Sequence, residues 1–190
     1  MSTALLRLEG VALVRGGRLL FDALDLALGA GGALLLTGPN GSGKSSLIRL
    51  AAGLLHASRG RVESQPAALA DDLAALDREL PLRRALRFWA GLGGDANRAE
   101  PAMEALALAP LATVPVRLLS AGQLKRAALA RVAASGRPLW LLDEPLNGLD
   151  AQSVGRLDAL IAEHRARGGA VLAASHAPLA GSWTRLELGR

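Results

Sequence analysis

The sequence predicts an α/β fold in which helices flank a mostly parallel β-sheet, with an antiparallel β subdomain at the N-terminus and a small α-helical insertion. Short apolar runs of strand length occur at residues 33–37, 139–143 and 170–175, and an amphipathic helical pattern separates the last two. A glycine-rich loop and a second helical pattern follow the first run directly. Strands that alternate with helices in this way are typical of a parallel sheet.

The composition is that of a single globular domain without cysteine chemistry. Hydrophobic residues make up 51% of the 190 residues, and the formal net charge is +5. The basic residues are scattered apart from Arg83, Arg84 and Arg87, with Arg78 just upstream, and only three tryptophans and two phenylalanines are available to stack on bases. We therefore interpret the charge as a solvated surface and predict no nucleic-acid partner. The absence of cysteine excludes disulfides and thiolate metal sites.

The hydropathy pattern predicts no membrane-spanning helix. No run of about 18 apolar residues free of charge is present. No basic region leads into an apolar segment near the N-terminus, so we expect no secretory signal. A cytosolic location is the expectation that follows.

The first third of the chain predicts the antiparallel subdomain and the start of the parallel sheet. Residues 5–14 alternate in part between apolar and polar, a glycine pair follows at 16–17, and residues 20–28 have strand character. Residues 44–54 have helical spacing. We expect little room for further strands between residues 54 and 66.

The rest of the chain predicts the helical insertion and the remainder of the sheet. The domain is expected to run over residues 1–190, with the helical insertion at about residues 76–135. The expected elements are a strand at 66–69, helices at 80–89 and 100–108, a helix at 151–167 and a closing strand at 183–188.

A glycine-rich loop after the strand at 33–37 predicts a nucleotide phosphate site. Its glycines let the backbone curl so that successive N–H groups point inward at phosphates, and the next helix adds its positive N-terminal end. Lys44 is expected to reach the β- and γ-phosphates of ATP, and the Ser45 hydroxyl to bind Mg²⁺. An accidental turn would rarely match this loop in a strand–loop–helix context. The loop comprises Gly38, Pro39, Asn40, Gly41, Ser42, Gly43, Lys44 and Ser45.

Two adjacent acids end the apolar run at residues 139–143. Asp143 lies at the expected carboxyl end of a parallel strand, where ligand sites gather, and we predict that it binds Mg²⁺. Glu144 follows directly and points another way, so we predict that it activates or orients the attacking water. Without the phosphate loop, an acid pair that caps a helix ahead of Pro145 would be the alternative.

A five-residue motif after the helical middle is the most specific signal in the chain. It reads Leu119, Ser120, Ala121, Gly122 and Gln123. Together with the phosphate loop and the acid pair, it resembles the LSGGQ signature of ATP-binding cassette (ABC) ATPases, with alanine for one glycine. The resemblance implies a P-loop NTPase core of ABC type that hydrolyses ATP with Mg²⁺. It also implies that Ser120 and Gly122 act on ATP held by a second copy of the chain.

The alanine and the serine of this motif have simple structural requirements. Ala121 is compatible with the motif provided that its φ is negative. Ser120 is expected to cap the following helix, and this role is compatible with contact to an anion because the helix N-terminus faces it.

Two further positions take their roles from the resemblance. Asp150 matches the D-loop, which touches the other subunit, and His176 matches the switch histidine that contacts the γ-phosphate. His56 and His164 have no such context, and we expect them at the surface.

Two residues that are typical of ABC ATPases are missing from this sequence. Asp72 lies in the segment that corresponds to the Q-loop, where it is the candidate substitute for the family's glutamine as a magnesium contact. The aromatic residue that stacks on adenine is also absent. Arg15 or Arg18 is expected to replace it by cation–π contact, while Phe21 is expected in the core.

Among ABC proteins, the chain resembles the heme-exporter ATPases of cytochrome c maturation. The resemblance rests on residues 79–89, on the alanine of the signature motif and on the ending at residues 186–189. It implies that ATP hydrolysis is coupled to heme export or to release of a heme-loaded chaperone, with no direct heme binding by this chain. The implied partners are integral membrane subunits and a second copy of the chain, at the cytoplasmic face of the inner membrane.

Other ABC classes compete with this interpretation. The ATPase of another ABC exporter, with a different substrate, is the main alternative. ABC proteins that act on ribosomes usually carry two cassettes, and this chain has room for one. Chromosome-type ABC ATPases place a long coiled coil between the phosphate loop and the magnesium-binding aspartate. The stretch between Lys44 and Asp143 is too short for such a coiled coil.

Overall fold

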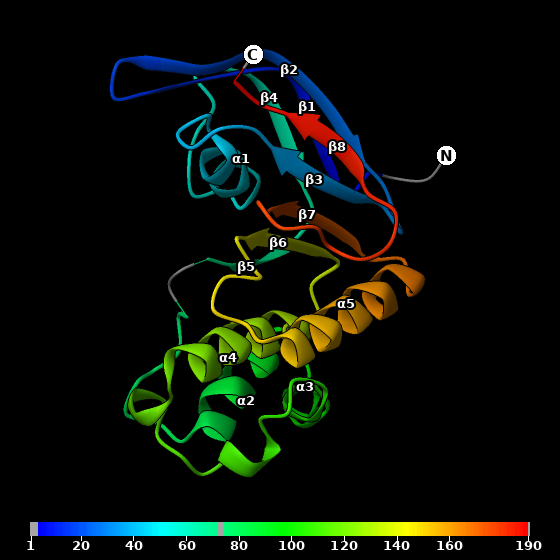
Figure 1. Cartoon of the computed structure of the whole chain (residues 1–190). Helices are drawn as coiled ribbons and strands as arrows, with labels where there is room; N and C mark the ends of the chain where they lie inside the picture. Colours follow the sequence, from blue (N-terminus) through cyan, green and yellow to red (C-terminus); the bar gives the residue numbers. More distant parts are fainter. Residues whose placement is uncertain (1–3, 72–73, 190) are drawn as a thin grey trace. The chain divides into compact units, whose positions relative to one another are not determined.

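The computed structural model describes residues 4–71 and 74–189 and divides into two compact units (Figure 1). The first, called the sheet unit here, comprises the residues up to Leu69, Pro138–Glu144 and the residues from His164 onward. The second, the helical unit, comprises Ala70–Arg137 and Pro145–Glu163. Among the described residues, no helix has both the length and the apolar character needed to cross a membrane.

The two sheets confirm the predicted α/β class with its antiparallel subdomain. The larger sheet has the strand order β5-β6-β7-β3-β8, and β3 pairs in parallel with both β7 and β8. The smaller, antiparallel sheet has the order β2-β1-β4. The strands are β1 (Leu6–Arg15), β2 (Arg18–Leu28), β3 (Ala33–Thr37), β4 (Arg59–Ser64), β5 (Ala67–Ala70), β6 (Leu139–Asp143), β7 (Ala170–Ala174) and β8 (Thr184–Glu187).

The central strands of the parallel sheet, β6, β7 and β3, are almost entirely apolar, as strands covered on both faces are. Every residue of β7 is buried, and so are the three leucines of β3. Helix α1 (Lys44–Ala51) contributes Leu47 and Ile48 to the same core. This helix contacts β6 and β7 of the parallel sheet and β4 of the antiparallel sheet, so it fills the space between the two sheets.

A two-residue turn joins β1 and β2 where the glycine pair predicted it. Gly16 and Gly17 both have positive φ, at 58° and 74°, and Arg15 pairs with Arg18 across the turn. Positive φ at both positions defines a type I′ turn, whose twist matches that of the flanking strands.

The strand β4 corrects the expectation of little room between residues 54 and 66. It pairs antiparallel with β1, and Val62 is its one half-buried residue. The segment carries no apolar alternation, so hydrophobic periodicity could not reveal it. Upstream, α1 ends at Ala51 rather than at Leu54, because Gly53 takes a left-handed conformation with φ 73°.

The helical unit holds the predicted helices with shifted ends. Helix α2 begins after Pro81, which occupies the N-cap position, and not at Leu80. Helix α3 ends at Ala105, because the chain turns at Ala107 with φ 52°. The helices are α2 (Leu82–Leu92), α3 (Ala99–Ala105), α4 (Ala121–Ala134) and α5 (Ala151–Ala166), the last extending into the sheet unit, with 3₁₀ turns at Ala96–Arg98, Ala109–Leu111 and Val116–Leu118.

Helices α2, α3 and α4 pack against one another within this unit. A buried arginine takes part in that packing. The Arg131 guanidinium of α4 lies 4.8 Å from the Trp89 ring centre of α2, and its Nε donates to Ala74 O at 3.0 Å. A cation–π contact of this kind compensates in part for taking the charge out of water.

His164 is not the surface residue that the sequence suggested. Its ring stacks on Trp140 of β6 at a centre-to-centre distance of 3.9 Å, and its Nε2 lies 3.2 Å from Pro138 O. Burial lowers the pKa of His164. Its place near the end of the α5 pattern concealed this environment, because the stacking partner comes from a strand 24 residues earlier.

Candidate functional site

The phosphate loop follows β3 and leads into α1, in the predicted order. A side chain on Gly38 (φ 128°) would collide with Leu188 O, so only glycine fits there. Gly43 immediately precedes α1 with φ 105°. Leu47 N–H bonds to Gly43 O at 2.8 Å, and the amides of the first turn before it have no acceptor within the helix. The loop therefore ends in backbone donors that suit an anion.

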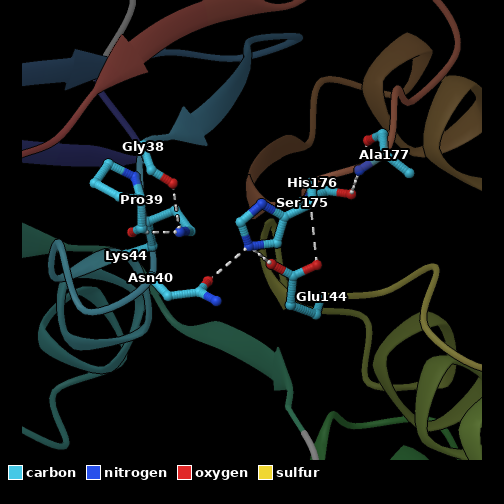
Figure 2. A network of polar contacts seen from close by, with 8 residues as sticks. All are labelled: Gly38, Pro39, Asn40, Lys44, Glu144, Ser175, His176 and Ala177. Atoms are coloured by element: carbon cyan, nitrogen blue, oxygen red, sulfur yellow. Dashed lines mark hydrogen bonds and ion pairs between the residues drawn. The ribbon is translucent and has the colours of Figure 1, made fainter.

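Lys44 is buried at the start of α1 and curls back over the loop. Its Nζ donates to Gly38 O at 2.8 Å and to Pro39 O at 3.0 Å (Figure 2). Only 8% of the residue is exposed. The ammonium group is thus held at the loop backbone, where a phosphate can exchange for the carbonyl contacts.

The acid pair lies where β6 ends. Asp143 is the last residue of the strand and pairs with Ala174 of β7, and its side chain is half-buried. Glu144 has φ 45°, a left-handed conformation that is rare for a residue with a Cβ, and its N–H donates to Ala174 O at 2.9 Å. The sharp turn at Glu144 is strained, and strain of this kind gathers at functional sites.

His176 stands beside Glu144, two residues after β7. Its backbone N–H donates to Glu144 Oε2 at 3.4 Å, and its Nε2 lies 3.4 Å from Glu144 Oε1 (Figure 2). The same Nε2 lies 3.1 Å from Asn40 Oδ1 in the phosphate loop. The sheet unit therefore joins Asn40, His176 and Glu144 by polar contacts, and Lys44 bonds to the carbonyls of Gly38 and Pro39 in the same loop as Asn40. The contact between Asn40 and His176 was not predicted, because loop membership was the only signal that Asn40 carried.

The signature motif lies in the helical unit, at the start of α4. Ser120 forms a capping box with Gln123: Gln123 N–H donates to Ser120 Oγ at 3.3 Å, and Ser120 N–H donates to Gln123 Oε1 at 2.9 Å. The expected cap is thus present. Ala121 is the first helical residue, so its φ is negative, as alanine requires.

Gly122 of the motif lies close to the backbone of another segment. A Cβ there would lie 3.1 Å from Gly148 O, in the segment after β6.

Asp150 lies in the same segment after β6, where it accepts a hydrogen bond from Ser153 N–H at 2.8 Å and so caps α5. Hydrogen bonds from Ser153 lower the pKa of Asp150. Asp150 is exposed, which leaves it accessible to a partner.

The remaining predicted residues have varied outcomes. Asp72 lies outside the described residues. Arg15 is tied to α1 by a bond from its Nη1 to Ser46 Oγ at 3.2 Å, one residue from Ser45. Phe21 is buried in the core, as expected.

Comparison with known proteins identifies the family. The family described as ABC transporter matches residues 21–147. A protein of Sphingopyxis alaskensis named cytochrome c biogenesis ATP-binding export protein CcmA is 59% identical over 180 residues, which cover 94% of this chain and 93% of the relative. A protein of Novosphingobium aromaticivorans with the same name is 56% identical over 171 residues, 90% of this chain and 87% of the relative.

Solved structures share the fold. The ATP-binding subunit of an ABC transporter matches with a TM-score of 0.81 at 22% identity, over 90% of this chain and 79% of that chain. An ATP-binding cassette solved as a post-hydrolysis dimer with ADP and phosphate matches with a TM-score of 0.80 at 20% identity, over 90% of this chain and 88% of that one. The chain belongs to the ABC transporter family, and within it to the cytochrome c biogenesis ATP-binding export proteins.

Proposed function

We propose that this chain is the ATP-hydrolysing subunit of an export complex of cytochrome c biogenesis, which couples ATP hydrolysis to heme export or to release of a heme-loaded chaperone. The observation that carries the proposal is the contact of Glu144 with His176, in the same sheet unit as the phosphate loop that holds Lys44, in a chain 59% identical to an export protein of that name. The phosphate-loop lysine, the acid pair and the histidine after β7 are the residue types on which the proposal rests.

The phosphate loop binds the nucleotide. Backbone amides at the start of α1 and the Lys44 ammonium surround the phosphates, and Lys44 exchanges its contacts with Gly38 O and Pro39 O for phosphate oxygens. Arg15 stacks on the adenine ring by cation–π contact. Its guanidinium bonds to Ser46 Oγ and so lies at the start of α1, beside the phosphate loop.

Ser45 and Asp143 are the residues that would hold Mg²⁺. A hydroxyl and one carboxylate, together with substrate phosphates, make a donor set typical of this hard cation. When bound there, Mg²⁺ supplies neutralisation of charge on the phosphates.

Glu144 orients and deprotonates the attacking water. Its carboxylate is held by the His176 backbone N–H, and its backbone takes the left-handed turn that directly follows Asp143. His176 presents its ring N–H beside that carboxylate, where it can stabilise charge on the γ-phosphate.

A second copy of the chain completes the site. Ser120 and Gly122 lie at the N-terminus of α4, whose amides favour an anion, and Asp150 is exposed for contact with the partner. These residues belong to the helical unit, and their nucleotide is the one bound by the other subunit.

Helix α2 is the docking face for an integral membrane subunit at the cytoplasmic side of the membrane. Phe88 and Leu92, which are 60% and 57% exposed, lie four residues apart and therefore on one side of the helix. Arg84 continues this row by one turn. A cavity of about 300 Å³ opens at the same helix, lined in part by Arg83, Arg84 and Arg87. We expect an apolar segment with an acidic residue as the occupant.

Two measurements test the proposal. Lys44→Ala is expected to abolish phosphate release from ATP without loss of the fold, measured by circular dichroism. Ordinary turnover by this variant would contradict the assignment of the loop.

Phe88→Asp is expected to reduce recovery of the membrane subunits with the tagged chain, whereas Leu54→Asp, at an exposed leucine of the sheet unit, should not. Recovery of membrane proteins without heme-handling partners would favour another ABC exporter.

A further inference from the structure

Asn40 is a residue of the phosphate loop whose side chain has no task in the proposed hydrolysis. Its amide oxygen lies 3.1 Å from His176 Nε2 (Figure 2). That contact joins the phosphate loop to the segment after β7, across 136 residues of sequence. The His176 side chain is 57% exposed, so packing alone does not hold the ring.

The two neighbours of the His176 Nε2 atom determine where its proton lies. Both are oxygens that accept: the Asn40 amide oxygen at 3.1 Å and the Glu144 carboxylate oxygen at 3.4 Å. A ring nitrogen between two acceptors must carry hydrogen, because its lone pair would repel both. A neutral ring that makes both contacts therefore carries its proton on Nε2.

The backbone of Asn40 is well placed to hold this contact. The residues around it are fixed: Lys44 Nζ bonds to Gly38 O and Pro39 O, and Ser42 N–H bonds to Pro39 O at 3.3 Å. A side chain that projects from so restrained a loop loses little further entropy when it forms a bond. The Asn40 bond is also the shorter of the two that Nε2 makes.

We propose that Asn40 is the positioning residue for His176: its amide oxygen holds the ring as the Nε2–H tautomer and aims it beside Glu144. The inference deepens the proposed function and rests on it. His176 then presents a hydrogen-bond donor, rather than a lone pair, to the charge that develops during hydrolysis. Without Asn40, the longer Glu144 contact is the one left to orient the ring among residues 4–71 and 74–189.

Nitrogen NMR of the full chain, labelled with ¹⁵N-histidine and without added nucleotide, tests the contact directly. The chain has three histidines, so the His176→Gln spectrum identifies the His176 signals. At about pH 8, above the usual histidine pKa, the wild type should show the Nε2–H tautomer. Asn40→Ala should give a mixture of tautomers, and Asn40→Asp, which retains an oxygen acceptor, should keep Nε2–H. Ser42→Ala, in the same loop, should leave the His176 signals unchanged.

A kinetic cycle tests whether the contact matters for hydrolysis. Asn40→Ala should lower kcat about fivefold with little change in KM, as expected for one lost hydrogen bond to a group that acts in the transition state. In the His176→Ala background the same change should have no further effect. Asn40→Asp should recover most of kcat and raise KM, because its charge repels the phosphates.

Three outcomes are decisive. An unchanged tautomer in Asn40→Ala would overturn the inference, and so would an equal loss of kcat in both backgrounds, which would mean that Asn40 acts through the loop. A wild type with the Nε2–H tautomer but no ATP hydrolysis would overturn the proposed function and, with it, the role of Asn40, while the hydrogen bond itself would stand.

Discussion

At Glu144, the backbone takes a left-handed conformation, with φ 45°, that costs a residue with a Cβ about 1–2 kcal/mol. Glu144→Gly and Glu144→Ala both remove the carboxylate, but only glycine relieves the strain. We expect Glu144→Gly to be more stable than Glu144→Ala by about 1 kcal/mol in urea denaturation. Equal midpoints for the two variants would show that the turn is not strained in solution.

Replacing the Glu144 carboxylate by the amide of glutamine tests its role in hydrolysis. Glu144→Gln retains the shape of the side chain but is a poor base, so ATP should still bind while hydrolysis stalls. ATP should then hold two subunits together, because we propose that each bound nucleotide contacts both. Gel filtration with and without ATP measures this change. A variant that stays monomeric and hydrolyses at the normal rate would refute the assignment.

Single residues were predictable where a motif carried them. Lys44, Asp143 and Ser120 lie in local patterns whose chemistry is read along the chain, and their local structure is as expected. The bond between Asn40 and His176 joins two segments by tertiary contact alone, so no spacing could reveal it. The stack of His164 on Trp140 escaped prediction for the same reason.

At the scale of elements, the His164 stack couples the end of α5 to the β6 strand and makes the fold sensitive to acid. Burial lowers the pKa of His164 below its usual value of about 6.5, so the unfolded chain binds the proton more readily. The stability from this residue is fully present above about pH 6.5 and is lost as the pH falls through the lowered pKa of the folded protein.

Urea denaturation between pH 8 and pH 5 measures this dependence. His164→Phe keeps an aromatic ring for stacking on Trp140 but cannot titrate, so its midpoint should fall less steeply toward acid than that of the wild type. His56→Phe, at an exposed histidine, should retain the steep fall. Parallel curves for His164→Phe and the wild type would mean that another group causes the loss.

Helices and strands were predictable where their apolar residues form a run or a regular repeat along the sequence. The three buried strands β3, β6 and β7 are apolar runs, and the sequence locates them within a residue. β4 is almost entirely polar or exposed and forms because its backbone pairs with β1, so it was missed. Helix ends moved where Pro81 or Gly53 constrains the backbone more strongly than the apolar pattern does.

At the scale of the whole molecule, the residues proposed to act on ATP are divided between the two units. The phosphate loop, the acid pair and His176 belong to the sheet unit, whereas Ser120 and Asp150 belong to the helical unit. The sequence order of the motifs implied this division. Family resemblance, rather than periodicity or composition, supplied the expectation that two copies share each site.

Mixed dimers test the shared site. Ser120→Arg damages the surface that acts on the partner's nucleotide, and Lys44→Ala damages the loop that binds the chain's own nucleotide. Either homodimer carries two damaged sites and should be inactive. A heterodimer of the two variants carries one intact site, with Lys44 from the first chain and Ser120 from the second, and one site that is damaged twice.

Mixing the two inactive variants in equal amounts should therefore restore hydrolysis through the heterodimers. About half of randomly assorted dimers are heterodimers, and each heterodimer has one intact site of its two. Phosphate release is the measurement. Because arginine adds a bulky cation at the contact, dimer formation is checked by gel filtration, and Ser120→Ala serves as the smaller matched variant. Heterodimers that form without recovering activity would mean that both sites must work together. Full activity of Ser120→Arg alone would show that each chain hydrolyses ATP without its partner's signature motif.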